Sequence, residues 1–401
     1  METIRYIGYY DILSNKRENR NYVLSAKNKM DYICEILVKC NYDVEIVSVS
    51  NTKNNKFYKK KKIDINSKMK LFLFSTIPSK SVIHKLFRMI NTKANLVIYF
   101  FKNISRKDKV IVYHSLGYYK LIAILKKIIG FKMILEVEEI YSDVTGNEKT
   151  RAKELAFFKL ADAYIFPTEL LDQYVNTEHK PSTIVYGTYK IEKDRGHKFH
   201  EDDGKIHLVY AGTFDPRKGG VSAAVATGEY LDKNFHIHIL GFGSEEEKKI
   251  LVKQIEEVNS KNGAVVTMDG LLSGEEYTKF LQSCDAGFST QNPDANFNDT
   301  SFPSKVLSYL SNGLRVVSVR IKALEESKVG NLLYFYDGND PKAIAETIKS
   351  INFDKYYDSR EFISQLDKEF TESLKKYYRK RWSIRHEQKS RSYYVLYNDD
   401  F

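Results

Sequence analysis

Short apolar runs alternate with longer amphipathic segments along almost the whole chain, and this alternation limits the possible folds more than any other feature. Strands are expected after Gly313 and at Ile4–Tyr9, Val44–Ser48, Lys109–Tyr113, Lys132–Val137, Ala163–Phe166, Thr183–Val185, Ile206–Tyr210, Phe235–Leu240, Ala264–Met268, Ala286–Ser289 and Leu332–Tyr336. Amphipathic helices are expected between them. Strands that alternate with helices form parallel sheets with helices on both faces, so the pattern predicts an α/β fold with doubly wound sheets.

A polar segment divides the chain into two halves. A length of 401 residues exceeds one typical core. Residues 190–205 lack apolar periodicity, so we expect them to link a first domain at 1–189 to a second at 206–355. The remainder, 356–401, contains the periodic stretch Phe362–Tyr378, which predicts a helix that packs back toward the first domain. Doubly wound domains that face one another bind ligands at the carboxyl ends of their strands, in the cleft between them.

The formal charge of +11 indicates an acidic partner. Nucleic acid, an anionic membrane surface and phosphorylated small molecules all satisfy this condition. The sequence contains no zinc-finger spacing, RNP-type aromatic motif or basic heptad region, so we expect no nucleic-acid partner. The densest basic run, Lys59–Lys62, is either a solvated loop or a segment attracted to anionic headgroups.

Cysteine usage and the first residues indicate a cellular compartment. Three scattered cysteines are too few for a disulfide framework, which fits a reducing cytoplasm. No signal peptide precedes the first expected strand, and no apolar run approaches the ~20 residues of a membrane helix. We therefore expect a cytoplasmic protein whose membrane contact is at most peripheral, on the inner face of the plasma membrane.

The stretch Phe302–Ser318 has the pattern of a phosphate-binding helix that leads into a buried strand. Ser301 is placed to cap the helix, Pro303 suits its first turn, and Gly313 supplies a left-handed stop. Free N–H groups and the helix dipole attract an anion, and Lys305 adds a full charge. The alternative is an ordinary buried helix and strand with a solvated Lys305.

The loop Ala211–Gly220 repeats this arrangement of a strand, a small-residue turn, a cation and a helix. It follows the strand Ile206–Tyr210 and contains Arg217 and Lys218. The two lysine-bearing turns together predict a site that holds a pyrophosphate between Lys218 and Lys305.

Several motifs follow one another in a recognisable order in the second half of the chain. They are Tyr210-Ala211-Gly212-Thr213 with Arg217-Lys218-Gly219, Leu240-Gly241-Phe242-Gly243, Asp269-Gly270-Leu271-Leu272, Ser283-Cys284-Asp285-Ala286-Gly287, and Phe302-Pro303-Ser304-Lys305 with Gly313. This order resembles the donor-binding domain of the family 4 retaining glycosyltransferases, which have the GT-B fold of two Rossmann-like domains facing across a cleft. The resemblance covers residues 206–350 well and the first half only in its pattern and in Leu160–Ile165.

The resemblance implies a nucleotide-sugar donor, with an acceptor-binding first domain and a donor-binding second domain. Lys218 and Lys305 would grip the donor diphosphate and act in catalysis, because fixed cations stabilise the charge on the leaving group without a metal. The other donor-binding residues that it implies are Gly212, Thr213, Arg217, Gly241, Gly243, Leu271, Thr300, Ser304 and Ser308.

Two departures from the family place the chain in a divergent branch. Many members have two glutamates seven residues apart beside the later helix, where this chain has Thr300 and Ser308. A hydroxyl at Ser308 can still meet a ribose, although it is a weaker acceptor than a carboxylate. The first loop also has Thr213 where many relatives have arginine.

In the first domain, Glu138 and Glu139 follow the strand Lys132–Val137 at the position where relatives contact the donor sugar. We expect one of them to act in catalysis by contacting the sugar or an acceptor hydroxyl, the alternative being that they only cap the next segment. His114 also follows a strand, and it is either an acceptor contact or a structural residue.

Arg17, Arg20 and Asn21 lie in a long polar loop after the first strand, where relatives meet the acceptor. A phosphorylated, lipid-linked acceptor suits these arginines and the basic surface. The alternative is a solvated loop.

We expect neither a cofactor nor a metal site. His236 and His238 alternate along one strand without further ligand spacing, so the sequence gives no complete metal-binding set. The nucleotide sugar is a substrate.

Three hypotheses of function remain. The first is a metal-independent, retaining glycosyltransferase that extends a lipid-linked glycan in bacterial capsule or O-antigen synthesis. The second is a non-catalytic relative that binds a nucleotide sugar or glycan and supports a partner transferase. The third is a nucleotide-dependent epimerase or dehydrogenase. It is disfavoured because neither Ile4–Asp11 nor Tyr210–Gly219 contains the full Gly-x-Gly-x-x-Gly motif.

Overall fold

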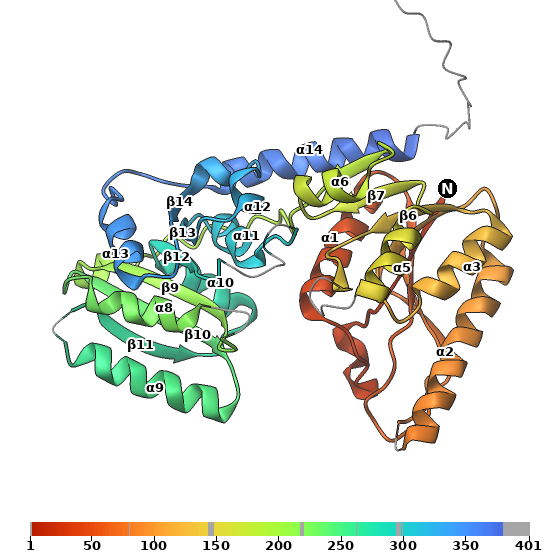
Figure 1. The fold of residues 1–401 in the computed structure, drawn as a ribbon, viewed down its shortest axis with the longest axis horizontal. Coiled ribbons are helices and arrows are strands. Elements are labelled where there is room, and N and C mark those ends of the chain that lie inside the picture. The colour runs from red at the N-terminus through yellow and green to blue at the C-terminus, as the bar shows by residue number, and fades with distance from the viewer. Residues whose placement is uncertain are drawn as a thin grey trace, which may run out of the picture.

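A computed structural model describes residues 2–79, 81–142, 148–216, 220–261, 263–293, 298 and 300–379. Within these residues the chain forms two domains, each built on a largely parallel sheet covered by helices (Figure 1). The predicted α/β class with two doubly wound sheets is confirmed.

The strands of the N-terminal domain form one sheet in the order β3-β4-β2-β1-β5-β6-β7-β8. Their bounds are β1 Thr3–Gly8, β2 Asp43–Ser48, β3 Lys61–Asp64, β4 Met69–Leu73, β5 Lys109–Tyr113, β6 Lys132–Glu136, β7 Ala163–Phe166 and β8 Ser182–Ile184. The helices that cover it are α1 Leu24–Lys39, α2 Val82–Asn103, α3 Tyr119–Ile129, α5 Glu148–Phe158 and α6 Glu169–Val175. All neighbouring strands are parallel except the β3–β4 pair.

The sheet of the C-terminal domain has the order β11-β10-β9-β12-β13-β14. Its strands are β9 Ile206–Thr213, β10 Phe235–Phe242, β11 Val265–Gly270, β12 Ala286–Ser289, β13 Arg315–Val319 and β14 Leu333–Tyr336. Its helices are α8 Val221–Ala226, α9 Glu245–Asn259, α10 Gly274–Ser283, α11 Ser304–Ser311, α12 Lys322–Glu325 and α13 Pro341–Lys349. The strand order reverses between β9 and β12, which is where open parallel sheets bind ligands at their carboxyl edge.

Two strands of the N-terminal domain were missed by the sequence analysis. Lys61 and Lys62 lie in the edge strand β3, where Lys61 Nζ is 2.6 Å from Glu18 Oε1 and Lys62 Nζ is 2.5 Å from Glu45 Oε1. The prediction of a wholly solvated or headgroup-binding run at Lys59–Lys62 is therefore wrong for its second half. Charged lysines suit an edge strand because they discourage pairing with another chain.

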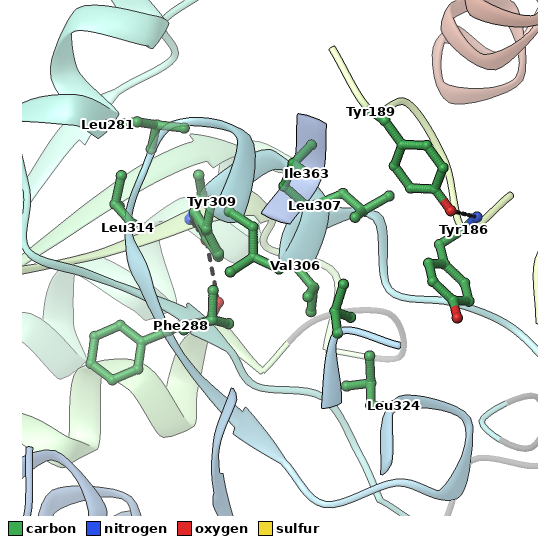
Figure 2. Packing of buried hydrophobic residues seen from close by; sticks show 14 of the residues in the cluster. Tyr186, Tyr189, Leu281, Phe288, Val306, Leu307, Tyr309, Leu314, Leu324 and Ile363 are labelled. Carbon is green, nitrogen blue, oxygen red and sulfur yellow. Dashed lines mark hydrogen bonds between the residues drawn. The ribbon is translucent and has the colours of Figure 1, made fainter. Parts of the chain in front are cut away.

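The long C-terminal helix α14, Arg360–Arg379, lies across both domains (Figure 1). On the N-terminal side Tyr32 stacks on Phe370 at 5.7 Å and donates a hydrogen bond to Asp367 Oδ1. On the C-terminal side α14 packs on α11, with Ile363 in the shared core (Figure 2). The short helix α7, His200–Asp203, belongs to the segment that connects β8 to β9.

Tyr309 fixes α11 on the sheet of the C-terminal domain (Figure 2). Its fully buried hydroxyl accepts a hydrogen bond from the Ala211 backbone N–H at 2.9 Å and donates one to the Phe288 carbonyl at 3.2 Å. The ring occupies the space beside Gly287, where a Cβ would lie 2.4 Å from Tyr309 Cγ. One side chain thus joins α11 to both strands at the point where the strand order reverses.

None of the helices in the described part of the chain is long and apolar enough to cross a membrane.

Replacement of Tyr309 by phenylalanine tests this joint. Tyr309→Phe leaves the buried Ala211 N–H without its hydroxyl partner, which costs about 1–3 kcal/mol. We expect the free energy of unfolding of the C-terminal domain, measured with denaturant, to fall by that amount. Tyr356→Phe is the matched control because Tyr356 is 86% exposed. Equal stability of the two variants would show that the hydroxyl does not secure α11.

Candidate functional site

The N-terminus of α11 lies at the junction of the two domains and at the carboxyl edge of β9. Phe302, just before α11, stacks on Tyr186 at 4.7 Å, and Tyr186 follows the last strand of the N-terminal domain. The Thr168 hydroxyl also donates to the Thr300 carbonyl at 3.3 Å across this junction. The start of α11 is therefore positioned by both domains.

Lys305 is a cation without a counter-ion among the described residues. Its Nζ lies 3.9 Å from the centroid of the Tyr210 ring, and no described side chain pairs with it. Burial lowers the pKa of Lys305 to about 7. Because the ammonium is partly stripped of water and unpaired, an anion that reaches it gains a strong interaction and raises its pKa.

The backbone of α11 adds hydrogen-bond donors at the same place. Its N-cap is Pro303, and no described side chain caps the helix. The prediction that Ser301 caps α11 is therefore wrong by two residues, and Pro303 is the N-cap and not a residue of the first turn. The uncapped N–H groups at the start of the helix, together with its dipole, favour a bound anion.

Two glycines let the loop backbones approach this point. A Cβ on Gly212 would lie 2.6 Å from Lys305 Cε and 3.0 Å from its Nζ. A Cβ on Gly241 would lie 1.8 Å from the Gly212 carbonyl oxygen, and Gly241 has a φ of 153°, which disfavours other residues. The C-terminus of β10 can therefore pack on the C-terminus of β9 only with glycine at position 241, whereas the glycine at position 212 leaves room for the end of the Lys305 side chain.

The other expected donor-binding residues differ in accessibility. Ser304 is exposed at the first position of α11, and Leu271 is 68% exposed after β11. The Ser308 hydroxyl lies 3.2 Å from the Tyr277 hydroxyl. Ser304 and Leu271 remain free for a ligand, whereas Ser308 already has a polar neighbour.

The expected donor-binding residues in and beside the loop after β9 are more enclosed than Ser304 and Leu271. A Cβ on Gly243 would lie 2.8 Å from Phe214 Cβ, so this glycine packs closely against the first loop. The Thr213 hydroxyl accepts a hydrogen bond from the Asp215 backbone N–H at 3.2 Å. Arg217 and Lys218 lie outside the described residues, so their expected phosphate contacts stay predictions.

On the N-terminal domain, an acidic cluster that the sequence analysis missed lies at the end of β6. The Glu138 carboxylate is 2.5 Å from Lys29 Nζ of α1. The fully buried Glu136 accepts a hydrogen bond from Tyr6 through Oε2, while its Oε1 has no donor among the described residues. Burial and the nearby Glu138 charge raise the pKa of Glu136. Only alignment of β1, β6 and α1 brings these groups together.

This cluster changes the expectation for Glu138 and leaves that for Glu139 open. Because Glu138 is tied to Lys29, it is held in a fixed orientation at the carboxyl edge of the sheet and remains 26% exposed. Glu139 is partly buried beside it. Glu138 can accept a hydrogen bond from a sugar or acceptor hydroxyl that reaches this edge.

Two residues expected to contact the acceptor are buried and bond to other groups of the N-terminal domain. His114 is buried with Nε2 2.6 Å from Glu154 Oε1, and burial lowers its pKa. The Arg20 side chain is fully enclosed: it donates to Glu18 and to the carbonyls of Ser50 and Phe74. The burial of both side chains among partners of their own domain favours a structural role for them, and their acceptor contacts stay predictions.

The remaining acceptor candidates are Arg17 and Asn21. Arg17 is exposed at the loop surface. The Asn21 side-chain oxygen accepts a hydrogen bond from the Asn51 backbone N–H at 2.5 Å. The Arg17 side chain is thus open to a phosphorylated ligand.

A third histidine lies beside the two that the sequence analysis named. His207 on β9 lies beside His236 and His238 on β10, and one ring nitrogen from each falls within 4.8 Å of the others. Burial and the two neighbouring histidines lower the pKa of His236 to about 4. The sequence pattern indicated only His236 and His238, which lie on one strand, because His207 belongs to the neighbouring strand.

Solved structures with the same architecture provide the comparison. A trehalose-6-phosphate protein from E. coli bound with UDP-2-fluoro glucose matches with a TM-score of 0.67 and 9% identity, over 94% of this chain and 98% of that one. Sucrose-phosphate synthase from Thermosynechococcus elongatus matches with a TM-score of 0.65 and 12% identity, over 94% and 98%. The chain has the GT-B fold.

A third match is a UDP-forming alpha,alpha-trehalose-phosphate synthase from Burkholderia xenovorans in complex with glucose-6-phosphate. It has a TM-score of 0.63 and 9% identity, over 94% of this chain and 99% of that one. No protein-family model and no curated protein sequence matches this chain. The shared feature is therefore a GT-B fold that spans almost the full length of the solved proteins.

The lowered pKa of Lys305 predicts a pH-dependent affinity for diphosphates. An anion favours the ammonium form, so binding above about pH 7 takes up a proton and the affinity falls as the pH rises. We expect calorimetry with uridine diphosphate to show this extra decline, approaching about tenfold per pH unit, in the wild type. Lys305→Met removes it. Titration of the diphosphate itself is common to both proteins, so identical pH profiles would exclude Lys305 from the anion site.

Proposed function

We propose that this protein is a glycosyltransferase that uses a nucleoside-diphosphate sugar as donor. The observation that carries the proposal is the N-terminus of α11 together with Lys305, beside the glycines at positions 212 and 241. Among the described residues no side chain caps this helix and none pairs with Lys305. The site lies where the strand order reverses, and the chain has the fold of solved proteins named as UDP-forming synthases.

Such a site suits the departure of a diphosphate. When the bond between the anomeric carbon and the phosphate oxygen breaks, its electron pair remains on the diphosphate. Lys305 and the N–H groups of α11 stabilise that charge, and Lys218 is proposed to do so from the facing loop. The acceptor oxygen then bonds to the anomeric carbon, and its proton goes to the departing phosphate oxygen. In this proposal the acceptor oxygen bonds on the same face of the sugar that the diphosphate leaves, so the configuration is retained, and the protein cations act in place of a metal.

The N-terminal domain supplies the orienting groups in this proposal. Glu138, fixed by Lys29, is placed to accept a hydrogen bond from a hydroxyl of the donor sugar or the acceptor. Arg17 adds a positive charge at the loop surface for a phosphorylated acceptor. The buried Glu136, which accepts a hydrogen bond from Tyr6, lies near enough to Glu138 that the Glu138 charge raises its pKa.

Loss of turnover in lysine variants tests the donor site. We expect Lys305→Ala and Lys218→Ala each to reduce release of free nucleoside diphosphate from a panel of nucleotide sugars by about 100-fold or more, because each removes a charge that stabilises the leaving group. Lys342→Ala is the control, since Lys342 is exposed on α13 of the same domain. Circular dichroism checks that each variant is folded.

The outcomes separate the two remaining classes of function. Full turnover in both lysine variants would overturn the proposed leaving-group role. Thermal shifts with nucleotide sugars but no release of sugar from the wild type would favour the non-catalytic relative, for which the absence of carboxylates at Thr300 and Ser308 is the supporting feature.

A lipid-linked acceptor is supported by an exposed apolar face on α2, at the outer edge of the N-terminal domain (Figure 1). Its first turns expose Val82, Ile83, Leu86 and Phe87, each by more than half. Lysines and an arginine on the same helix accompany them. An apolar face beside basic side chains binds anionic membrane surfaces without crossing them. We propose that α2 brings the protein to a membrane-bound glycan.

Vesicle sedimentation tests this surface. We expect the wild type to bind vesicles that contain an anionic phospholipid more than purely zwitterionic ones, and the pair Ile83→Glu with Phe87→Glu to abolish binding, because both apolar contacts are lost and negative charge is added. Ile250→Glu is the control, since Ile250 is 64% exposed on α9 of the other domain. Equal binding by all three proteins would contradict the role of α2.

The acceptor is tested separately. Turnover with a soluble sugar phosphate alone, independent of vesicles, would replace the lipid-linked acceptor by a sugar phosphate and leave the donor site as proposed.

A further inference from the structure

Three histidines meet on one face of the C-terminal sheet, away from the proposed donor site. His207 of β9 is the direct cross-strand neighbour of His236 of β10, and His238 lies two residues further on the same face. One ring nitrogen from each lies within 4.8 Å of the others. His207 and His238 are buried, and His236 is partly exposed, so the cluster is enclosed but reachable from solvent.

Each ring is oriented by an oxygen on one of its two nitrogens. His207 Nε2 lies 3.0 Å from Asp203 Oδ1, His238 Nδ1 lies 3.2 Å from Asp269 Oδ2, and His236 Nε2 lies 3.0 Å from Thr267 Oγ1. An oxygen partner on the outer nitrogen fixes the ring and raises the basicity of the inner nitrogen, as is usual for metal-bound histidines.

The inner nitrogens have no such oxygen partners. His207 Nδ1 and His238 Nε2 lie 2.8 Å apart, and His236 Nδ1 has no hydrogen-bond partner in the described part of the chain. The His236 and His238 rings stack with their centroids 4.1 Å apart. The 2.8 Å contact is a hydrogen bond in which one of the two rings must supply the proton, and a cation bound between the rings would take the place of that proton.

We propose that His207, His236 and His238 bind one zinc-class divalent ion, through Nδ1 of the first two and Nε2 of the third. Three histidine nitrogens are a common ligand set for Zn²⁺, with a fourth position left for water. Asp203 and Asp269 offset the charge of the ion from behind the rings. The partial exposure of His236 gives the water and the ion a path to the site.

The position of this site indicates a structural role. His207 begins β9 whereas the donor site lies past its end at Thr213, about 20 Å away at the rise of a strand. Asp203 ends the connecting helix α7, and Phe199 of the same segment packs on the rings of His207 and His238 at 5.2 and 5.5 Å. A bound ion would therefore hold the interdomain segment on the C-terminal sheet.

Metal binding by the tag-free, full-length protein tests the proposal. After treatment with a chelator and its removal, we expect calorimetry to show one Zn²⁺ bound per chain, and Co²⁺ to give the intense visible absorption of a tetrahedral site. The thermal midpoint should rise with Zn²⁺ and fall back with chelator, because the ion binds the folded state.

Variants assign the ligands. His236→Ala and His238→Gln should each abolish the cobalt band and the zinc-dependent shift of the midpoint. His197→Ala is the matched control because His197 is about half exposed on the connecting segment, and it should leave both unchanged. His236 is partly exposed, so its replacement is expected to leave the far-ultraviolet circular dichroism unchanged.

Two results would overturn the site. One is the absence of stoichiometric zinc binding by the wild type. The other is binding that persists equally in the folded His236→Ala and His238→Gln proteins. Release of nucleoside diphosphate is not a readout here, so failure of this site leaves the proposed donor chemistry untouched.

Discussion

The packing of α11 on the C-terminal sheet is the constraint on which the candidate site depends. Tyr309 joins this helix to β9 through the Ala211 N–H and to β12 through the Phe288 carbonyl, at the place where the strand order reverses. Because Gly287 has no Cβ, the Tyr309 ring can pack directly against the backbone of β12. With the helix held there, its uncapped N-terminus and Lys305 can only lie at the carboxyl edge of β9.

The two domains meet through the same region. Phe302 stacks on Tyr186 just before α11 begins, and α14 packs on α11 while Tyr32 of the N-terminal domain binds Asp367 of α14. Contacts from both domains therefore converge on α11 and the residues just before it. At this place the Lys305 ammonium is buried, and burial lowers its pKa. The diphosphate of the proposed donor would neutralise its charge.

Much of the fold followed from local pattern. Strands β5, β7 and β12 have the bounds expected from the sequence, because buried parallel strands are continuous apolar runs and turn residues flank them. The strands β3 and β4 were missed because edge strands are short, polar and rich in lysine, and so resemble loops. Gly212, Gly241 and Lys305, which we propose as donor-site residues, could be singled out because a strand, a glycine turn and a helix start leave a sequence signal.

The sequence by itself determined the order of βα units, the glycines at strand ends and the basic helix start, since these depend on neighbours in the chain. Only the tertiary structure decided which polar groups meet across strands. Strand register brought His207 to His236 and His238, and packing of α1 brought Lys29 to Glu138. The tertiary structure also enclosed the Arg20 side chain among the carbonyl oxygens of Ser50 and Phe74. Such contacts join residues far apart in the chain, so no local periodicity records them.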